Sequence, residues 1–375
     1  MWKEKEGGEM VRIVFVFLLA ISAWSTPLYE KFPSYSYVFE EFDIDETFIY
    51  NDDFGIFVKK NEERYRKFYR NSLKRGGYLI PTFKSMLLQD GLSDLFVYMS
   101  MIESGFSTDC VSCKSAVGIW QFMEATAKEY DLSVNSDFDE RLDPILATSA
   151  AMNYMHELYK EFDKWYLVAM AYNCGEGRLE KAIRRAGTDN ISVLMSSEEN
   201  YIPKETRTYI KKILLVAMIG EDISLGLEKS EEVEEELRQL YGENIVQVDV
   251  EPGERLEYIA RIIHMDPKEL LKLNHHFKNG TIPVKLPSYK INIPTDKVVD
   301  FYAVYALQKE LKKYAKTHYL SHIVQQGEGL GKIADRYETT PGEILIYNPQ
   351  AKKGIDEGQV LVIPVTKAVF ETFSR

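Results

Sequence analysis

The sequence has few cysteines and histidines, and this scarcity excludes several kinds of site. It contains 3 cysteines and 6 histidines in 375 residues. Cys110 and Cys113 have the C-x-x-C spacing of a metal site, but no second pair and no histidine partner completes a set of zinc ligands. We therefore predict no metal and no cofactor. An oxidising compartment would favour a disulfide among Cys110, Cys113 and Cys174, and the sequence leaves its pairing open.

Excess basic charge and a long apolar run are also lacking. The net charge of -12 argues against nucleic acid as a partner, because such binding depends on basic side chains. The apolar stretch 11–25 is too short for a comfortable membrane span and ends in a small-x-small pattern, Ala23-Trp24-Ser25. We interpret residues 1–25 as a secretory signal peptide, with a buried helix as the alternative. The protein is then exported, to the periplasm or cell envelope.

What the sequence does contain is a long stretch of helical signals. A chain of 375 residues with 45% hydrophobic content predicts two to four globular domains. Helical patterns are dense between residues 81 and 219. Asp143 is a good N-cap before Pro144, and Gly175 and Gly177 are expected to break the helix that begins at Trp165. This region therefore predicts an all-α domain.

Two later segments resemble each other and indicate an internal repeat. Pro252-Gly253-Glu254-Arg255-Leu256 in the first matches Gln326-Gly327-Glu328-Gly329-Leu330 in the second. The first segment continues through Asn274 to a strand-like end at 291–294. The second continues through Asn348 to a strand-like end at 361–364. The pattern predicts a strand, two short helices and a strand in each repeat.

Glu103 is the most informative residue of the helical region. It lies four residues after Met99, near the end of a helix-like run that Gly105 can terminate. Its carboxyl group is thus expected to point toward an apolar interior. Burial and the negative end of the helix dipole both raise the pKa of a carboxyl group, so Glu103 could serve as a general acid. A buried glutamate with local amide partners is the alternative interpretation of this residue alone.

Several segments around Glu103 together resemble a known family. They occur in a fixed order, and they are Gly118-Ile119-Trp120-Gln121-Phe122-Met123, Phe138-Asp139-Glu140-Arg141-Leu142-Asp143-Pro144, Ala171-Tyr172-Asn173-Cys174-Gly175-Glu176-Gly177 and Tyr201-Ile202-Pro203-Lys204-Glu205-Thr206-Arg207. With Glu103-Ser104, they are similar to the soluble-lytic-transglycosylase catalytic domain, and most similar to the membrane-bound lytic murein transglycosylase D subfamily. The resemblance covers about 81–220. The C-terminal repeats resemble LysM modules, closely at 321–364 and less so at 246–294, where a Pro-rich stretch intervenes.

This resemblance implies a fold class and a division of the chain. We expect an α+β protein that is mainly α, with a lysozyme-like all-α catalytic domain followed by small β-α-α-β LysM modules. The expected parts are a signal peptide (1–25), an N-terminal arm and helix (26–80), the transglycosylase domain (81–225), an acidic linker (226–244), a degenerate LysM-like module (245–295), a connecting helix (296–318) and a LysM module (319–366). Residues 26–60 show weak periodicity and are expected to be irregular or a short packing arm.

The resemblance also implies an activity on peptidoglycan. Glu103 matches the single catalytic acid/base of the family. It would protonate the glycosidic oxygen between N-acetylmuramic acid (MurNAc) and N-acetylglucosamine (GlcNAc), and then deprotonate the muramoyl 6-hydroxyl, which closes a 1,6-anhydro ring. An intramolecular nucleophile removes the need for a second carboxylate. Peptidoglycan glycan strands are the implied partner, held through GlcNAc by the LysM modules.

The remaining site residues come from the same motif matches. The implied substrate-binding residues are Ser112, Gln121, Tyr172, Asn173, Glu205 and Tyr209. Each has a structural alternative. Tyr172 could be a core aromatic residue with a bonded hydroxyl, Gln121 a helix cap, and Glu205 a partner of the helix dipole. A disulfide from Cys174 to Cys110 or Cys113 would brace the groove.

Two other functions remain open at this point. A lysozyme-type muramidase on the same fold would need a base to activate water, and Asp139, Asp143 and Glu176 are the nearby carboxylates in sequence. A non-catalytic LysM scaffold for the cell wall is the other alternative. The product of wall digestion would distinguish the first two functions, because only the lyase leaves an anhydro end.

Overall fold

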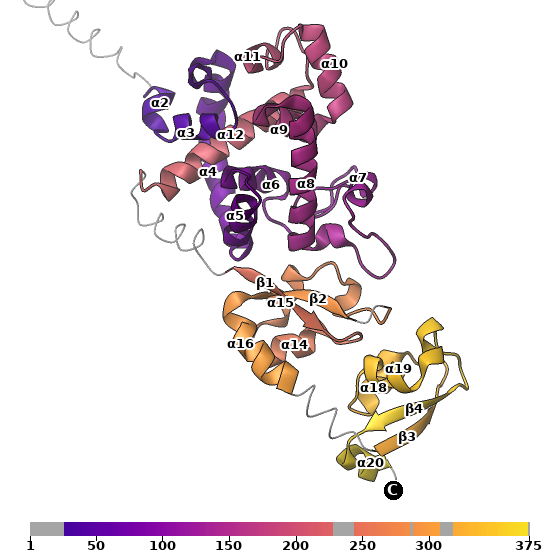
Figure 1. Ribbon diagram of the computed structural model, residues 1–375. Coiled ribbons are helices and arrows are strands. Elements are labelled where there is room, and N and C mark those ends of the chain that lie inside the picture. The colour runs from indigo at the N-terminus through magenta and orange to yellow at the C-terminus, as the bar shows by residue number, and fades with distance from the viewer. Residues whose placement is uncertain (1–25, 228–243, 286–287, 308–317, 374–375) are drawn as a thin grey trace, which may run out of the picture.

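The chain folds into a large helical domain followed by two small modules that each contain a pair of strands (Figure 1). The structure is a computed structural model and describes residues 26–227, 244–285, 288–307 and 318–373. The predicted signal peptide and the acidic run at 228–236 lie outside the described residues. Among the residues that are described, no helix is both long and apolar enough to cross a membrane.

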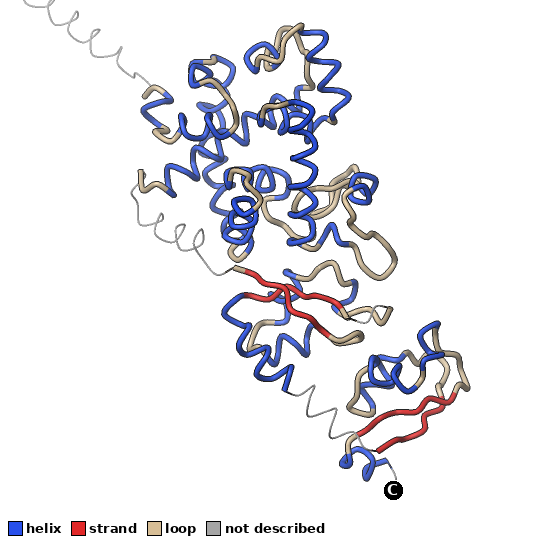
Figure 2. Tube along the Cα trace, viewed as in Figure 1, coloured by secondary structure: helices blue, strands red, loops and turns tan. Residues whose placement is uncertain are grey.

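The helical domain is built around one extended hydrophobic core. Its long helix α12 packs against α4, α6 and α9, and α8 packs against α5 and α9 (Figure 2). In chain order its helical elements are α2 (Leu28–Lys31), α3 (Tyr35–Glu41), η1 (Glu46–Tyr50), α4 (Asp52–Gly76), α5 (Leu79–Gln89), η2 (Asp94–Phe96), α6 (Val97–Ser104), α7 (Glu124–Glu129), η3 (Glu140–Leu142), α8 (Pro144–Phe162), α9 (Trp165–Cys174), α10 (Glu176–Ala186), α11 (Ile191–Leu194) and α12 (Lys204–Ser224).

The N-terminal part of this domain is more ordered than its sequence indicates. Residues 28–60 form α2, α3, η1 and the start of α4 instead of an irregular arm. Phe32, Phe39 and Phe54 are fully buried in the core of the helical domain. The buried positions are separated by turns and 3-10 segments, so their spacing has no single period. This segment is therefore part of the helical domain's core.

The helices that carry the later motifs begin and end largely as the sequence predicts. The Asp143 carboxylate accepts hydrogen bonds from the backbone N–H groups of Ile145 and Leu146, at 2.9 and 3.1 Å, and so caps α8. Gly175 ends α9, as expected. The expectation for Gly177 is wrong, because it lies in the first turn of α10, where glycine is tolerated near a helix start.

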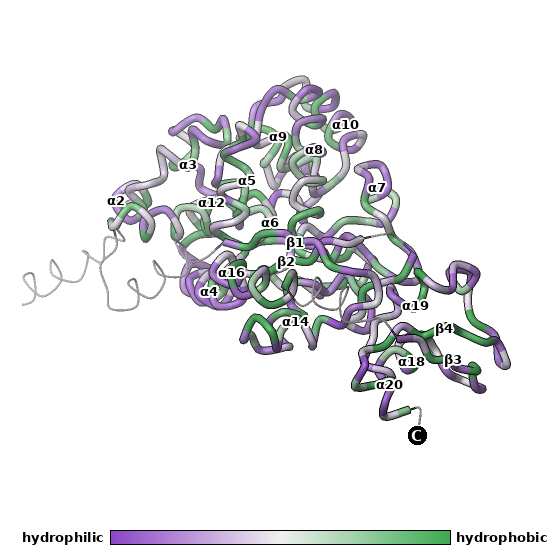
Figure 3. Tube along the Cα trace, turned by 60° about the horizontal axis from the view of Figure 1, so that its bottom comes forward, coloured by the Kyte–Doolittle hydropathy of each residue, from purple (hydrophilic) through white to green (hydrophobic). Residues whose placement is uncertain are grey.

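Each C-terminal module has the predicted order of strand, two short helices and strand. The first module consists of β1 (Ile245–Val250), α14 (Leu256–Ile262), α15 (Pro267–Leu273) and β2 (Tyr289–Pro294), followed by η5 (Thr295–Lys297), α16 (Val298–Phe301) and η6 (Tyr302–Ala306). The second consists of β3 (His318–Ile323), α18 (Leu330–Arg336), α19 (Pro341–Tyr347), η7 (Pro349–Lys353) and β4 (Val360–Val365), followed by α20 (Lys367–Phe373). The strands pair antiparallel within each module, β1 with β2 and β3 with β4. Figure 1 and Figure 3 show β1 and β2 beside the helical domain and β3 and β4 farther from it, and the Ile245 N–H at the start of β1 donates to the Thr82 hydroxyl of α5 at 2.9 Å.

Candidate active site

Glu103 lies in the last turn of α6, where the sequence analysis placed it. Gly105 follows with a left-handed backbone, φ 59°, and its N–H bonds to the Met101 carbonyl, which ends the helix. Met99, one turn earlier, is fully packed in the core. The Glu103 side chain is partly accessible and otherwise enclosed by protein. A carboxyl group is thereby held at the edge of the hydrophobic core.

This environment raises the pKa of Glu103 to about 7. Burial is the main cause, and it is opposed by the Tyr209 hydroxyl and by the positive charge of Lys212. The negative charge of Glu205 adds a smaller upward effect. Near neutral pH, Glu103 is therefore present in both protonated and ionised forms. A group with such a pKa can first donate a proton and then accept one.

Tyr209 and Tyr172 flank this carboxyl group. Tyr209, from α12, is 4% exposed, and its hydroxyl and Glu103 perturb each other's pKa. Their contact lacks the geometry of a full hydrogen bond, and the Tyr209 hydroxyl has no other partner among the described residues. The Tyr172 hydroxyl instead donates to the Trp120 carbonyl at 2.8 Å. Of the two hydroxyls, the one on Tyr209 is thus buried beside the Glu103 carboxyl group without a competing partner.

Asn173 and Glu205 connect the ends of neighbouring elements around the site. The Asn173 side-chain oxygen accepts a hydrogen bond from the Thr206 hydroxyl at 2.8 Å, which joins the end of α9 to the start of α12. Glu205, in the first turn of α12, faces Lys114 at 3.7 Å, and both side chains are exposed. Such an exposed pair contributes little to stability. The Glu205 charge acts on Glu103, and Asn173 is linked through Thr206 to the same first turn of α12.

Ser112 and Gln121 belong to the loop that follows α6. The Ser112 hydroxyl accepts a hydrogen bond from the Ala116 N–H at 3.0 Å, within a tight turn. Gln121 has a left-handed backbone, φ 52°, and its side-chain amide donates to the carbonyls of Cys110 and Gly118. Gln121 therefore fastens the loop and does not cap a helix. We call residues 106–122 the groove loop.

A close backbone contact explains the glycine that begins the Gly-Ile-Trp-Gln segment. Gly118 has φ +81°, and a Cβ atom at this position would lie 1.9 Å from the Arg141 carbonyl oxygen. Any side chain here would force the groove loop away from η3. The Arg141 guanidinium also donates to the Phe122 carbonyl, at 3.3 Å. The two motif segments are thereby locked together.

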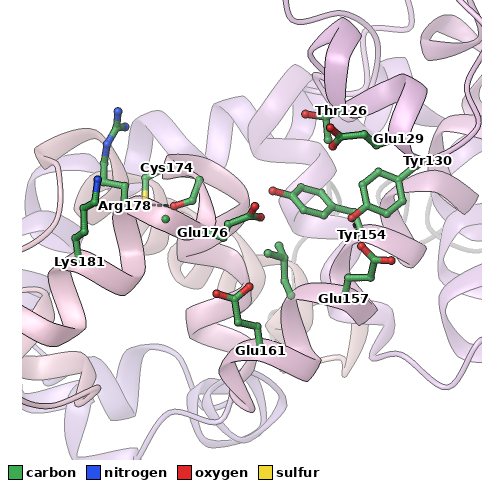
Figure 4. A pocket seen from close by; sticks show the side chains of 13 residues that line it. Thr126, Glu129, Tyr130, Tyr154, Glu157, Glu161, Cys174, Glu176, Arg178 and Lys181 are labelled. Atoms are coloured by element: carbon green, nitrogen blue, oxygen red, sulfur yellow. Dashed lines mark hydrogen bonds between the residues drawn. The ribbon is translucent and has the colours of Figure 1, made fainter.

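The surface beyond Tyr172 is hollowed into a cavity of about 740 Å3. Figure 4 shows Tyr130 and Tyr154 side by side in it, with Glu157 close to Tyr130 and Glu176 on the side of Tyr154 away from Tyr130. The rings of Tyr154 and Tyr172 have centroids 5.3 Å apart. Glu103 does not line the cavity, which is joined to the site through the Tyr172 ring. Flat aromatic faces with nearby carboxylates suit a polyhydroxylated ligand.

The cysteines form no disulfide in the structure. Cys110, Cys113 and Cys174 are all free thiols, so the expected brace across the groove is absent. Burial raises the pKa of Cys110 and of Cys174, which keeps both thiols protonated. Within the described parts of the chain, no group of three His, Cys, Asp or Glu side chains is arranged to hold a metal ion.

Sequence reasoning missed four residues that shape the site. Lys212 acts on the Glu103 charge, Thr206 holds Asn173, and Tyr130 and Tyr154 line the cavity. Lys212 lies on the same helix as Tyr209 and three residues after it, so helical spacing could have indicated it. No comparable signal existed for Tyr130 and Tyr154, which come from different segments.

Comparison with known proteins identifies three domains along the chain. Residues 83–195 match the Transglycosylase SLT domain, 244–310 the LysM-like domain of lytic transglycosylase MltD, and 322–364 the LysM domain. The membrane-bound lytic murein transglycosylase D of Escherichia coli K12 is 26% identical over 278 residues, which are 71% of this chain and 59% of that protein. The chain thus spans less than two thirds of this relative's length.

Two further similarities cover smaller parts. The peptidoglycan transglycosylase gp16 of Escherichia phage T7 is 35% identical over 33% of this chain and 9% of that protein. A solved structure, of the Pseudomonas aeruginosa lytic transglycosylase Slt inactive mutant E503Q, aligns with TM-score 0.32 and 21% identity over 40% of this chain and 24% of that one. The domain matches confirm the resemblance expected from the motifs. The chain therefore carries a transglycosylase SLT domain, a LysM-like domain of the lytic transglycosylase MltD type and a LysM domain, in that order.

Proposed function

We propose that this chain is an exported lytic transglycosylase, which cleaves the MurNAc-β-1,4-GlcNAc bond of peptidoglycan and leaves a 1,6-anhydromuramoyl end. The observation that carries this proposal is the Glu103 carboxyl, with its pKa raised to about 7, inside a transglycosylase SLT domain. The names of the lytic murein transglycosylase and peptidoglycan transglycosylase relatives support the substrate class.

In the proposed reaction one carboxyl group performs two proton transfers. Protonated Glu103 donates its proton to the glycosidic oxygen, which leaves as the 4-hydroxyl of GlcNAc. The resulting carboxylate takes the proton of the muramoyl 6-hydroxyl while that oxygen bonds to the anomeric carbon. The ring closes, Glu103 is protonated again, and no water is consumed.

The neighbouring side chains would orient the sugar and the carboxyl group. The buried Tyr209 hydroxyl can donate to the Glu103 carboxylate between the two steps. Asn173 is held by Thr206 and can present its amide N–H2 group to substrate. In the groove loop, Gln121 uses its amide N–H2 on backbone carbonyls, which leaves its oxygen to accept from a sugar hydroxyl.

Three carboxylates were candidates for the base of a muramidase, and two of them have other partners. Asp139 is buried and paired with Arg141, with a shortest contact of 2.7 Å. Asp143 is buried and caps α8. Glu176 is exposed in the wall of the cavity. Because Asp139 and Asp143 are buried and already hydrogen-bonded, neither is placed to activate a water molecule, which favours lyase over hydrolase chemistry. Of the three candidates, Glu176 is the carboxylate that still has to be tested.

The remaining parts of the proposal concern substrate length and location. The cavity with Tyr130 and Tyr154 would hold further sugars of the same strand, with ring faces against the sugar rings. The second LysM module would bind GlcNAc-containing strands and keep the enzyme on the wall. Residues 1–25 would export the chain to the periplasm or cell envelope.

Digestion of purified sacculi tests the proposed reaction. We expect Glu103→Gln to reduce the release of soluble fragments by about a thousandfold or more, because this group supplies both proton transfers. Mass spectrometry of the wild-type products should show anhydro ends, which are lighter than reducing ends by one water. Glu176→Gln is the matched comparison, and its products should keep anhydro ends, because an amide can replace this carboxylate as a hydrogen-bond partner of a sugar but not as a base. Reducing ends, together with loss of activity in Glu176→Gln, would establish the muramidase instead.

The pH dependence gives an independent check on Glu103. Because the first step needs the protonated form, kcat/KM should be constant below about pH 7 and fall about tenfold per pH unit above it. Lys212 lowers the pKa of Glu103, so Lys212→Gln should move this alkaline limb to higher pH. Lys211→Gln is the control, because Lys211 interacts with Asp53 and Arg207 instead. A limb that stays in place in Lys212→Gln contradicts the assignment.

A further inference from the structure

The first C-terminal module is docked on the catalytic domain through backbone and side-chain contacts. Phe138 and Phe277 pair across the interface as a β-bridge, and the Asp139 N–H donates to the His276 carbonyl at 3.1 Å. The Lys278 ammonium donates to the Asn135 carbonyl at 2.7 Å. Figure 1 shows β1, β2 and α15 directly beneath the helical domain. We call this contact surface the seam.

A buried polar cluster lies at the centre of the seam. The Asn292 side chain donates to the Asp143 carboxylate at 3.2 Å and to the Leu273 carbonyl at 3.0 Å. His276 approaches the same carboxylate at 3.4 Å. Asp143, His276 and Asn292 are at most 3% exposed. Buried polar groups need such defined partners, so this cluster fixes the orientation of the module.

The second module has the same fold but lacks the residues of the seam. The two strands β2 and β4 align at their proline ends, so Asn292 corresponds to Val362, which is 40% exposed. After the shared asparagine of each module, His275-His276-Phe277 corresponds to Pro349-Gln350-Ala351. The polar residues that dock the first module are therefore specific to it.

One path from the seam leads to the groove loop through η3. The backbone N–H of Asp139 donates to the His276 carbonyl, and the Asp139 carboxylate accepts two hydrogen bonds from the Arg141 guanidinium, at 3.0 and 2.7 Å. The same guanidinium donates to the Phe122 carbonyl in the groove loop. Since Gly118 packs against the Arg141 carbonyl, the groove loop rests on this segment. The module thus contacts the η3 segment, and that segment in turn holds the groove loop.

A second path is direct and begins near Glu103. His275 Nδ1 and the Thr108 hydroxyl share a hydrogen bond of 2.9 Å. Thr108 is buried and lies five residues after Glu103, at the start of the groove loop. Two residues later, the Cys110 carbonyl receives the hydrogen bonds from Gly118 N–H and the Gln121 side chain. His275 therefore holds the end of the loop on which these contacts depend.

We propose that the LysM-like module, residues 244–307, is a structural part of the active site and that His275 is a positioning residue for the groove loop. The module's contribution to catalysis is then to hold the loop that binds the sugar, while retention on the wall falls to the second module. The effect on catalysis rests on the proposed function, whereas the effect on loop order does not.

Hydrogen exchange of the full chain tests the loop directly. In His275→Ala, peptides that cover 106–122 should exchange at least about tenfold faster, because a partly buried hydrogen bond at the start of the loop is lost. Peptides of α12 and of the second module should be unchanged. Pro349→Ala alters the corresponding position of the second module and should leave 106–122 as in the wild type. Unchanged exchange of 106–122 in His275→Ala overturns the proposal.

Kinetics on soluble glycan fragments separate positioning from general stability. His275→Ala should raise KM by about tenfold with a smaller change in kcat, since a displaced loop weakens sugar binding more than proton transfer. Thr108→Val should have the same effect, and the double variant should be no worse than either single one. His275→Asn retains a hydrogen-bonding atom near Thr108 and should recover part of the loss.

The outcomes distinguish failure of this proposal from failure of the proposed function. Additive effects of the two substitutions, or a fall in kcat alone, would overturn the positioning role of His275. If the wild type releases no peptidoglycan fragments, the proposed function fails, and the exchange measurement still decides whether the module orders the groove loop.

Discussion

The two C-terminal modules share a fold and differ in what covers one face of the sheet. In both, an asparagine at the end of the second helix bonds to the last strand: Asn274 to Asn292 and Asn348 to Val362, with side-chain amide and carbonyl groups both used. In the first module the face that contains Asn292 is covered by the catalytic domain. In the second, Val362 and its neighbours Tyr319 and Ile323 are exposed.

This difference separates the role of a module from its fold. The internal hydrogen bonds of the asparagine maintain the β-α-α-β unit in both cases, so they give no information about partners. The outward residues of β1, β2 and the loop after α15 decide whether the module docks. A LysM-like pattern in sequence therefore indicates the unit, and the residues of its outer face indicate its partner.

The largest expected effect comes from the aromatic residue at the seam. Phe277 is 3% exposed and contacts Tyr289 within the first module. Phe277→Ala should cost about 3–5 kcal/mol of unfolding free energy and lower activity as well. In the second module, Ile344→Ala should destabilise that module by about 2–5 kcal/mol while sparing activity on soluble fragments. Calorimetry with activity assays measures both, and equal losses of activity would remove the distinction between the modules.

Exchanging the corresponding strand residues should give a smaller effect. Asn292→Val leaves the buried Asp143 carboxylate without one hydrogen bond and should cost about 1–3 kcal/mol. The reverse exchange, Val362→Asn, is made on an exposed strand and should change stability by less than about 1 kcal/mol. Urea unfolding of the two variants measures the difference. A cost for Val362→Asn as large as that for Asn292→Val would show that the outer faces are not different.

Acid should weaken the seam before it weakens the second module. Burial lowers the pKa of His276 from 6.5, against a smaller upward effect of Asp143, with His275 adding to the lowering. The unfolded chain then binds a proton that the folded chain does not, so this contribution to stability is complete above about pH 6.5 and falls below it. His276→Gln should flatten the loss of thermal stability between about pH 7 and pH 5.5.

The second module provides the contrasting titration. Hydrogen bonds from the Gln325 N–H and from His322 hold the pKa of Glu328 below its usual 4.5. Its contribution is therefore complete above that pH and is lost only as the pH falls further. Hydrogen exchange as a function of pH can follow the two modules separately. Loss of protection in both modules at the same pH would contradict this contrast.

The smallest effect is expected where the two modules approach each other. Arg255 of the first lies 3.8 Å from Asp335 of the second, and both side chains are exposed. Asp335→Ala should change the unfolding free energy by less than about 0.5 kcal/mol, because solvent screens such pairs. Thermal unfolding measures this, with Lys367→Ala as a control at another exposed pair. A larger loss would mean that the second module is also fixed to its neighbour.

The sequence predicted the local features of the site better than its assembly. Helical spacing and Gly105 correctly placed Glu103 at a helix end, and the Asp143-Pro144 pair correctly predicted the cap of α8. These features depend on neighbours in the chain. The packing of α3 against α12 and the docking of Asn292 depend on partners more than a hundred residues away, for which a single sequence carries no signal.

For some motif residues the sequence indicated one contact, and the structure shows a second one. Tyr172 is half-buried with a bonded hydroxyl, as its structural alternative stated, and it also faces the site. Within the segment Phe138–Pro144 the Asp143 cap was predicted from the residues themselves, whereas the contacts of Asp139 and Arg141 became apparent only in the structure. Motif matching therefore identified the residues, and the three-dimensional contacts were needed to say what they hold.

The Asp143 cap has a consequence for the order in which the chain is made. The carboxylate receives its two backbone hydrogen bonds from α8 alone, so the helical domain can complete this cap before residue 292 has been synthesised. The acceptor for the module is then already oriented when the module arrives. Since domains fold as units from the N-terminus, docking can proceed onto a finished surface without rearranging the catalytic helices.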